Sequence, residues 1–118
     1  MSVTVDANIL LYATDTSSER HDRAGQLLRE LIAGPRLLYV FWPVIMAFLR
    51  ISTHPSVFAR PLAPAQARDN VSSLLDQPLV RTTGEAPGFW QEFERVAATH
   101  VVRGNLVTDA HVAALMRQ

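Results

Sequence analysis

The sequence contains no cysteine and no lysine, and it has no long hydrophobic run. Without cysteine there is no disulfide framework, no thiolate metal site and no cysteine nucleophile. No apolar stretch approaches the roughly 20 residues that a membrane-spanning helix needs. The first residues, Met1 to Asp6, lack the basic and apolar regions of a signal peptide. We therefore expect a cytoplasmic protein that does not associate with membranes.

The charges of the chain are balanced, because it has eleven arginines and eleven acidic residues and its formal net charge is zero. This balance argues against a protein that coats nucleic acid through a highly basic surface. RNA remains open as a substrate, because a local group of arginines binds phosphate in a forked geometry. With 118 residues, 48% of them hydrophobic, the chain has ordinary globular composition. Residues 1–118 are therefore expected to form a single domain.

Strand-like and helix-like segments alternate along the chain. Apolar and β-branched runs predict strands over residues 2–6, 37–41 and 79–82. Apolar periodicity with proline starts and glycine or proline stops predicts helices over residues 7–13, 19–33, 43–52, 64–76, 88–100 and from 108 onward. This alternation predicts an α/β fold in which parallel strands are joined by right-handed crossovers. We expect the first strand to be central in the sheet.

The larger apolar side chains are expected to belong to packed faces. On the helix over 19–33, Leu27 is expected on the buried face. On the helix over 88–100, Trp90 and Phe93 are expected to point inward. Trp42 and Phe48 also fall at helical spacing, which indicates core or dimer surface rather than platforms for stacking bases.

Two aspartates stand where an α/β fold places its functional site. Asp6 ends the first strand, and sites in open α/β sheets form outside the carboxyl ends of strands. Asn8 follows two residues later and can hydrogen-bond to Asp6 or to the backbone. Asp109 follows Thr108, which we expect to cap the last helix, and the dipole of that helix favours the ionised carboxylate. Each pattern alone is equally typical of a plain turn or a plain helix cap.

If the two carboxylates meet, they require a partner. Two such charges repel each other by about 4 kcal/mol at 4 Å with an effective dielectric near 20. A stable pair therefore needs a cation or a shared proton. Oxygen ligands in a chain without cysteine favour Mg²⁺, with Mn²⁺ as the alternative. Such a metal ion would polarise a phosphodiester and activate water.

Three ordered motifs carry a resemblance to a known family. They are the segments VDANILLYA over residues 5–13, AFLRISTHP over 47–55 and RGNLVTDAHVAAL over 103–115. Together they resemble a PIN-domain toxin of the VapC type, the nuclease partner of a type II toxin–antitoxin pair. The resemblance covers the whole chain.

The resemblance implies a PIN-like parallel β-sheet flanked by helices and a Mg²⁺-dependent endoribonuclease that cleaves RNA phosphodiester bonds. Asp6 and Asp109 match the family's first acid and its later helix-start acid, so both are expected to be catalytic and to bind the metal. The implied partners are an RNA substrate, a small cognate antitoxin that occupies the site, and a second copy of the chain in a homodimer.

Two departures from the family pattern stand out. Many relatives carry an acid where this chain has Ala47. Relatives also continue beyond the last helix into a further strand and an Asp-bearing loop, so this PIN-like domain is expected to be C-terminally truncated and to lack the C-terminal strand. Asp15 and Glu85 are the nearest substitutes for the two missing acids, and both are equally typical of solvated loop residues.

Further residues have two interpretations each. Arg50 can reach a phosphate or the carboxylate of Asp6, or it can form a structural salt bridge. Arg103 can contact RNA from a loop beside the metal, or it can belong to a plain turn. His54, before Pro55, is expected to hold loop backbone. The apolar side of Ile9, Leu10 and Tyr12, together with the helix over 19–33, is expected to form a groove for an antitoxin segment.

Two other functions remain open at this point. The first is a PIN-fold module that has lost catalysis and binds only RNA or an antitoxin, which the Ala47 position favours. The second is a phosphotransfer or receiver-like α/β domain that shares only the early aspartate. A receiver-like domain is expected to carry a lysine on a late strand, and this chain has none.

Overall fold

A computed structural model of the chain describes residues 2–118. Within this range the elements are β1 (Ser2–Thr4), α1 (Ala7–Thr14), α2 (His21–Ala33), β2 (Leu37–Phe41), α3 (Trp42–Ser52), α4 (Pro64–Leu75), β3 (Val80–Thr83), α5 (Phe89–Ala98) and α6 (Leu106–Arg117). The predicted α/β architecture is confirmed. The chain divides into two compact units, the first ending at Thr83 and the second running from Gly84 to Gln118.

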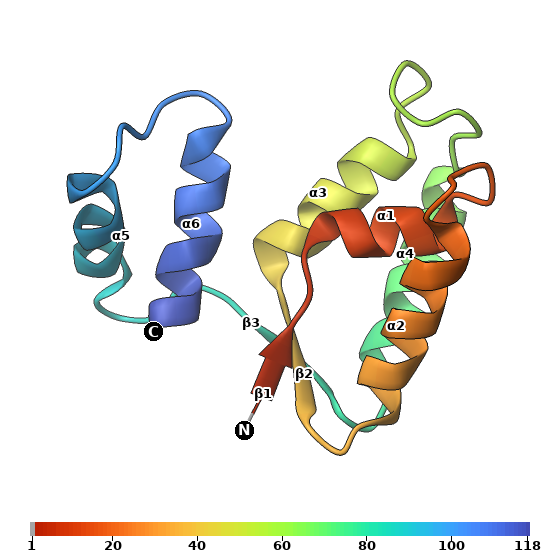
Figure 1. Cartoon of the computed structure of the whole chain (residues 1–118), viewed down its shortest axis with the longest axis horizontal. Coiled ribbons are helices and arrows are strands. Elements are labelled where there is room, and N and C mark those ends of the chain that lie inside the picture. Colours follow the sequence, from red (N-terminus) through yellow and green to blue (C-terminus); the bar gives the residue numbers. More distant parts are fainter. Residues whose placement is uncertain (1) are drawn as a thin grey trace. The chain divides into compact units, whose positions relative to one another are not determined.

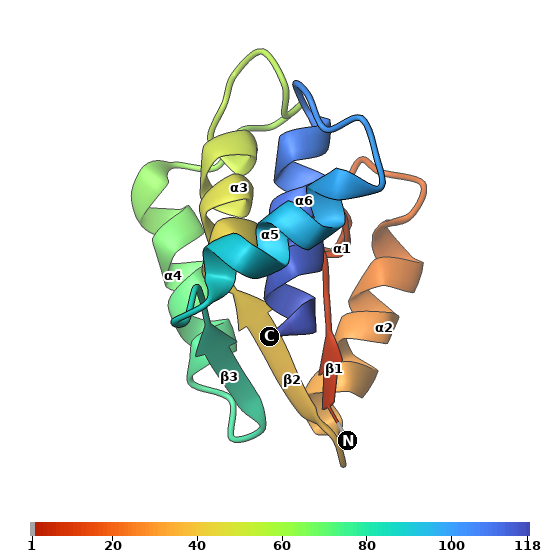
Figure 2. The same ribbon diagram turned by 90° about the vertical axis from the view of Figure 1, so that its left-hand side faces the viewer.

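The sheet of the first unit has three parallel strands in the order β1-β2-β3 (Figure 2). Leu38 of the central strand pairs with Val3 on one side and with Val80 on the other. Both Leu38 and Val40 are completely buried. The expectation that the first strand is central is wrong for this sheet, because β2 lies between β1 and β3. An apolar strand pattern indicates burial, but it does not specify which neighbours a strand pairs with.

The helices of the first unit lie on one side of this sheet (Figures 1 and 2). Helix α1 packs on α2 and α3, and α4 packs on α3 and β3. Ile45 and Phe48 of α3 are almost completely buried, as is Ala67 of α4. Leu27 of α2, expected on the buried face, is instead 41% exposed. The 100° step between residues places Leu27 at the edge of the apolar stripe, where it lines an open groove between α1 and α2.

Glycine ends α2 for a steric reason. Gly34 has φ +94°, a backbone conformation that residues with a Cβ atom rarely adopt. A Cβ atom at this position would also collide with the side chain of Leu79, which precedes β3. The predicted stop at Gly34-Pro35 is confirmed, and the close approach to Leu79 accounts for the need for glycine there.

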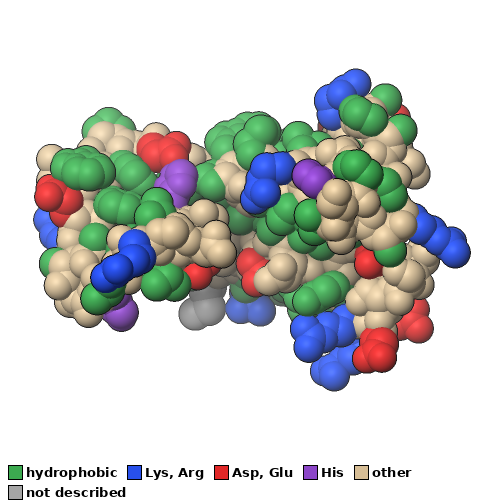
Figure 3. All heavy atoms as spheres, turned by 90° about the horizontal axis from the view of Figure 1, so that it is seen from above, with side chains coloured by type: hydrophobic (Ala, Val, Ile, Leu, Met, Phe, Trp, Pro, Cys, Tyr) green, Lys and Arg blue, Asp and Glu red, His purple; other side chains and the backbone are tan. Residues whose placement is uncertain are grey.

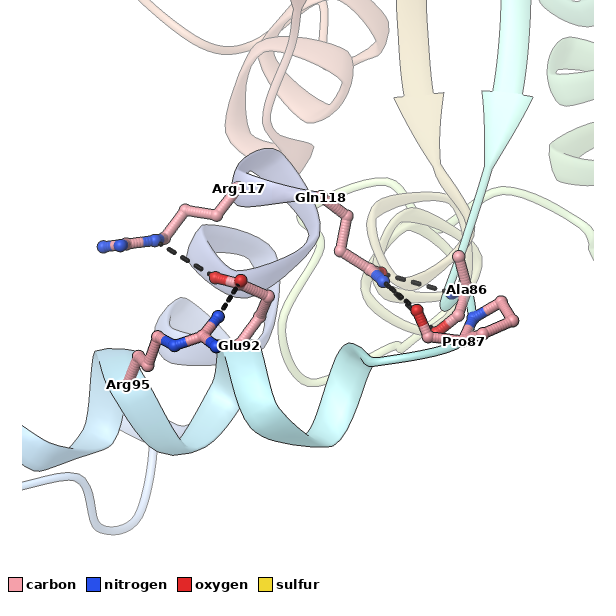
Figure 4. A network of polar contacts seen from close by, with 6 residues as sticks. All are labelled: Ala86, Pro87, Glu92, Arg95, Arg117 and Gln118. Carbon is pink, nitrogen blue, oxygen red and sulfur yellow. Dashed lines mark hydrogen bonds and ion pairs between the residues drawn. The ribbon is translucent and has the colours of Figure 1, made fainter.

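The second unit is a pair of packed helices, α5 and α6, joined by residues 99–105. The ring of Phe89 meets that of His111 edge-on, with centroids 5.2 Å apart. At the end of α6 the side chain of Gln118 accepts from Ala86 N and donates to Ala86 O, each at 3.2 Å (Figure 4). Arg117 pairs with Glu92 of α5, which also pairs with Arg95. These contacts fix α6 against α5 and against Ala86 in the segment that precedes α5.

The prediction that Trp90 points inward is wrong. Its side chain is 60% exposed, and it stacks on Phe93 with ring centroids 5.6 Å apart. Phe93 is half-buried, while Phe48 lies in the core as expected and Trp42 is 43% exposed. A two-helix unit offers each helix only a narrow apolar seam, so the wide indole remains outside it.

Between residues 2 and 118, no helix is both long enough and apolar enough to cross a bilayer.

Candidate active site

Asp6 lies just beyond the carboxyl end of β1 and forms the N-cap of α1. Its Oδ1 atom accepts a hydrogen bond from Ile9 N at 3.1 Å, which satisfies one of the free amides at the helix start. The side chain is exposed. Since the cap occupies Oδ1, the carboxylate can present Oδ2 to a ligand.

Neither Asn8 nor Arg50 forms a hydrogen bond or an ion pair with Asp6 among residues 2–118. Asn8 is exposed in the first turn of α1, and the amide that Asp6 binds is that of Ile9 instead. Arg50 is exposed in the last turn of α3 and forms no ion pair among residues 2–118. The interpretation of Arg50 as a structural salt bridge, or as a partner of the Asp6 carboxylate, is therefore wrong for this structure. Its guanidinium remains available to a phosphate.

Asp109 lies in the first turn of α6 with an exposed side chain. The prediction that Thr108 caps this helix is wrong, because α6 already begins at Leu106 and its N-cap position is Asn105. Asn105 has helical dihedral angles, φ −63° and ψ −22°, and makes no side-chain cap bond. The chain thus enters the helix directly from the turn at Gly104. Thr108 becomes an exposed residue on the turn that carries Asp109.

Arg103 is exposed in the loop that leads into α6. Its carbonyl oxygen accepts from Leu106 N at 3.1 Å, and Gly104 follows with φ +57°. The backbone of Arg103 therefore forms a tight turn, in agreement with the plain interpretation, while its guanidinium stays free to contact a phosphate. His54 acts as expected, because its Nδ1 accepts from Ser56 N at 3.1 Å and holds the loop after α3.

The two acids considered as substitutes have other partners. Asp15 caps the opposite end of α1 and accepts from the amide and hydroxyl of Ser17. At about 1.5 Å per helical residue, its Cα is roughly 13 Å along the chain from that of Asp6, so the two cannot share one small ion. Glu85 contacts Nε2 of His111 at 2.5 Å. Both are thus engaged in local contacts, and their role as substitutes for the missing acids stays a prediction.

The Glu85–His111 contact gives the second unit a predictable dependence on pH. Hydrogen bonds from its own backbone, and then from His111, hold the pKa of Glu85 below its ordinary value of 4.5. Because the folded pKa is the lower one, the stabilisation is complete above about pH 4.5 and is lost as the pH falls through the folded value. We expect Glu85→Gln to lower the free energy of unfolding at pH 7 by less than about 1 kcal/mol, since the pair is exposed.

Urea unfolding of the parent and of Glu85→Gln at several pH values measures this effect. The difference in unfolding free energy between the two proteins should shrink as the pH is lowered from 5 toward 3. A difference that stays constant over that range would show that the Glu85 charge does not contribute.

A metal ion would have carboxylate oxygens as its protein ligands here. Within neither unit do three Asp, Glu or His side chains of residues 2–118 gather into a group that could hold a metal ion. Mg²⁺ does not require such a group, because it commonly retains several waters and binds through one or two carboxylates. Asp6 and Asp109 therefore fit Mg²⁺ by their chemistry. They belong to different units, and their meeting stays a prediction.

A groove runs between α1 and α2 in the first unit. It encloses about 470 Å³ and is lined by Ile9 and Tyr12 of α1 and by α2 residues that include Leu27. Leu10, expected in the same groove, is buried and lines a separate pocket of about 440 Å³ bordered by α2, α3 and α4. The predicted groove is thus present with this one correction.

A contact between α1 and α2 has no counterpart among the sequence predictions. Arg20 donates to the hydroxyl of Tyr12 at 3.2 Å and lies over its ring, 5.3 Å from the centroid. Nδ1 of His21 donates to the carbonyl oxygen of Tyr12 at 2.9 Å. The two contacts join residues that are eight or nine positions apart in the sequence, across the turn between two helices. No local sequence pattern predicts contacts at this separation. They shape one end of the groove.

Charged side chains are interspersed on the face of the molecule drawn in Figure 3. Arginines and acidic residues form small separate groups among hydrophobic and neutral side chains there. This mixture of charges agrees with the zero net charge of the chain. Recognition of an anionic polymer would therefore depend on individual arginines.

Known proteins resemble this chain along nearly its whole length. Ribonuclease VapC48 of Mycobacterium tuberculosis is 47% identical over 117 residues, which cover 99% of this chain and 81% of the relative. The chain belongs to the VapC ribonuclease family. Ribonuclease VapC37 of the same organism is 33% identical, covering 94% of this chain and 77% of its own. No family profile matches the sequence.

The fold is that of VapC proteins as well. The crystal structure of M. tuberculosis VapC20, described as a toxin that cleaves the sarcin–ricin loop, matches with a TM-score of 0.70 at 16% identity. The match covers 98% of this chain and 82% of VapC20. VapC relatives are named ribonucleases, so the family places the chain among the nuclease hydrolases. The resemblance found in the three sequence motifs is thereby confirmed.

Proposed function

We propose that the chain is a Mg²⁺-dependent endoribonuclease, the toxin component of a toxin–antitoxin system. The observation that carries this proposal is the placement of two exposed carboxylates at helix starts in a chain 47% identical to a VapC ribonuclease. Asp6 and Asp109 are the proposed metal ligands and catalytic acids. When bound, Mg²⁺ would polarise the scissile phosphodiester and lower the pKa of a bound water.

The remaining site residues have positioning roles in this proposal. Asn8 and Thr108 are exposed on the same turns as Asp6 and Asp109, where their side chains can hydrogen-bond to ligands or water. Arg50 and Arg103 are exposed, and a guanidinium binds a phosphate through two parallel hydrogen bonds.

The proposed partners follow from the same surfaces. The groove between α1 and α2 combines apolar residues such as Ile9 and Leu27 with charged residues such as Arg23, and it suits an amphipathic helix of a small antitoxin. A second copy of the chain is the other proposed partner, as a homodimer. The substrate is RNA, and a structured RNA loop is a reasonable first substrate to test, since VapC20 is a toxin that cleaves the sarcin–ricin loop. We place the activity in the cytoplasm, where such RNA is found.

A second candidate function is a PIN-fold module that binds RNA or an antitoxin without cutting. One observation favours it: Ala47 stands where many relatives carry an acid. It predicts binding of RNA without metal-dependent cleavage.

The deciding experiment is cleavage of a labelled RNA that contains a structured loop, titrated with Mg²⁺. The ribonuclease predicts cleavage that rises with Mg²⁺ and disappears when EDTA is added. The binding module predicts an intact RNA at every Mg²⁺ concentration, together with RNA binding in a gel-shift assay. Intact RNA at saturating Mg²⁺ would therefore contradict the proposed enzyme.

A further inference from the structure

An apolar pocket lies beside Asp109 in the second unit. It encloses about 410 Å³ between the end of α5, the connecting loop and the first half of α6. Its walls are almost entirely the apolar atoms of valine, leucine and alanine residues, with His100 and Asp109 also contributing to the lining. A pocket of this size with few polar groups is typical of a site for a small organic group.

The surroundings of the pocket are apolar and open to solvent. Val101 and Leu106, which line it, are 65% and 50% exposed, and the neighbouring Val107 is 44% exposed. Exposing apolar area costs about 25 cal/mol per Å². Contiguous apolar surface beside a polar functional residue usually marks a place where something binds.

We propose that this pocket receives one unpaired nucleobase of the RNA substrate, next to the phosphodiester that Asp109 serves. This inference rests on the proposed function. A base has flat apolar faces that suit the aliphatic walls, and His100, which also lines the pocket, is one of the aromatic residue types on which proteins stack unpaired RNA bases.

The position of Arg103 agrees with this occupant. The loop residues Val101 and Val102 line the pocket, and Arg103 follows them directly with an exposed side chain. A nucleotide whose base entered the pocket would keep its phosphate outside, where a guanidinium can bind it. In this proposal the lining residues Val101, Leu106 and Ala113 determine which base the pocket accepts.

The test uses binding, so that it does not depend on cleavage. The full chain carrying Asp6→Asn is titrated against a short single-stranded RNA, and against copies with one abasic ribose at each position in turn. We expect one abasic position to weaken binding about tenfold, within the range known for a bound base. With Ala113→Leu added, the pocket is filled and the same abasic position should no longer matter.

The matched control is Ala98→Leu, since Ala98 is an exposed alanine at the last position of α5 and does not line the pocket. It should keep the tenfold effect. Val101→Ser is a second variant at an exposed position, where the fold is not at risk, and it should weaken binding of the unmodified RNA several-fold. Circular dichroism melts of all three variants verify folding.

The outcomes separate this inference from the proposed function. An abasic scan that is flat at every position, or that responds alike in Ala113→Leu and Ala98→Leu, overturns the nucleobase pocket. The latter result would be expected if a protein partner covers this apolar surface instead. Cleavage by the unmutated chain is measured separately, and its absence contradicts the ribonuclease whatever the scan shows.

Discussion

Asp6→Asn is expected to lower kcat/KM for RNA cleavage about a thousandfold while the protein stays folded. Asparagine caps a helix as well as aspartate does, so its side-chain oxygen can still accept from Ile9 N. The substitution removes the charge that a divalent cation requires. Loss of several kcal/mol of metal-assisted stabilisation, about 4 kcal/mol here, corresponds to a thousandfold in rate. Cleavage of a fluorophore-quencher RNA at saturating Mg²⁺ measures the ratio.

The matched control is Asp22→Asn. Asp22 is also exposed and lies in the first turn of a helix, α2, so the substitution removes the same charge from the same kind of position. Its kcat/KM should stay within about twofold of the parent, since its charge is expected to have only a weak, screened effect at the site. If Asp6→Asn cleaves as fast as Asp22→Asn, Asp6 is not part of the active site.

Much of the fold could be predicted because local signals agreed with the final structure. The apolar run over 37–41 gives β2 with the predicted bounds, and Pro43 and Pro64 lie in the first turns of α3 and α4. Gly34 ends α2 because its backbone adopts a left-handed conformation. Signals of this kind act within a few residues, so the sequence contains them directly.

The errors arose where distant residues decide the outcome. The place of β1 at the edge depends on which strands pair, and the exposure of Leu27 and Trp90 depends on how much of each helix a neighbour covers. Thr108 looks like a cap, but the turn at Gly104 already starts the helix at Leu106. A favourable cap residue does not prevent a helix from starting earlier when the preceding backbone is already helical.

In the candidate site, too, the features that depend on local sequence were predicted, and those that depend on packing between distant residues were not. The sequence placed Asp6 at the end of the first strand and Asp109 at the start of the last helix. In the structure β1 already ends at Thr4 and Asp6 is the exposed N-cap of α1, while Asp109 is exposed in the first turn of α6. The apolar pocket beside Asp109 was not predicted, because its walls come from α5, α6 and the loop between them. His100 and Val101 carry no motif of their own. Their relation to Asp109 appears only when the two helices pack.

Leu38→Ala is expected to destabilise the protein by about 3 kcal/mol. Leu38 is completely buried in the central strand, between β1 and β3. Removing three carbon atoms from such a position loses their transfer free energy and leaves a cavity that the surrounding strands close only in part, which costs about 2–5 kcal/mol in known cases. Since domains of this size are stable by only about 5–15 kcal/mol, the loss is a large fraction of the total. Equilibrium unfolding in urea measures it.

Leu27→Ala is the matched control, because it removes the same atoms from a side chain that is 41% exposed in α2. Alanine also has the highest helix propensity, so the change should stay within about 1 kcal/mol. RNA cleavage per folded molecule should be unaltered by Leu38→Ala at low temperature, since Leu38 lies in the core of the first unit and contacts no solvent. Equal stability of the two variants would show that β2 is not the centre of the core. A Leu38→Ala protein that is fully folded yet inactive would mean that the position of Asp6 at the end of β1 depends on the packing of the neighbouring strand.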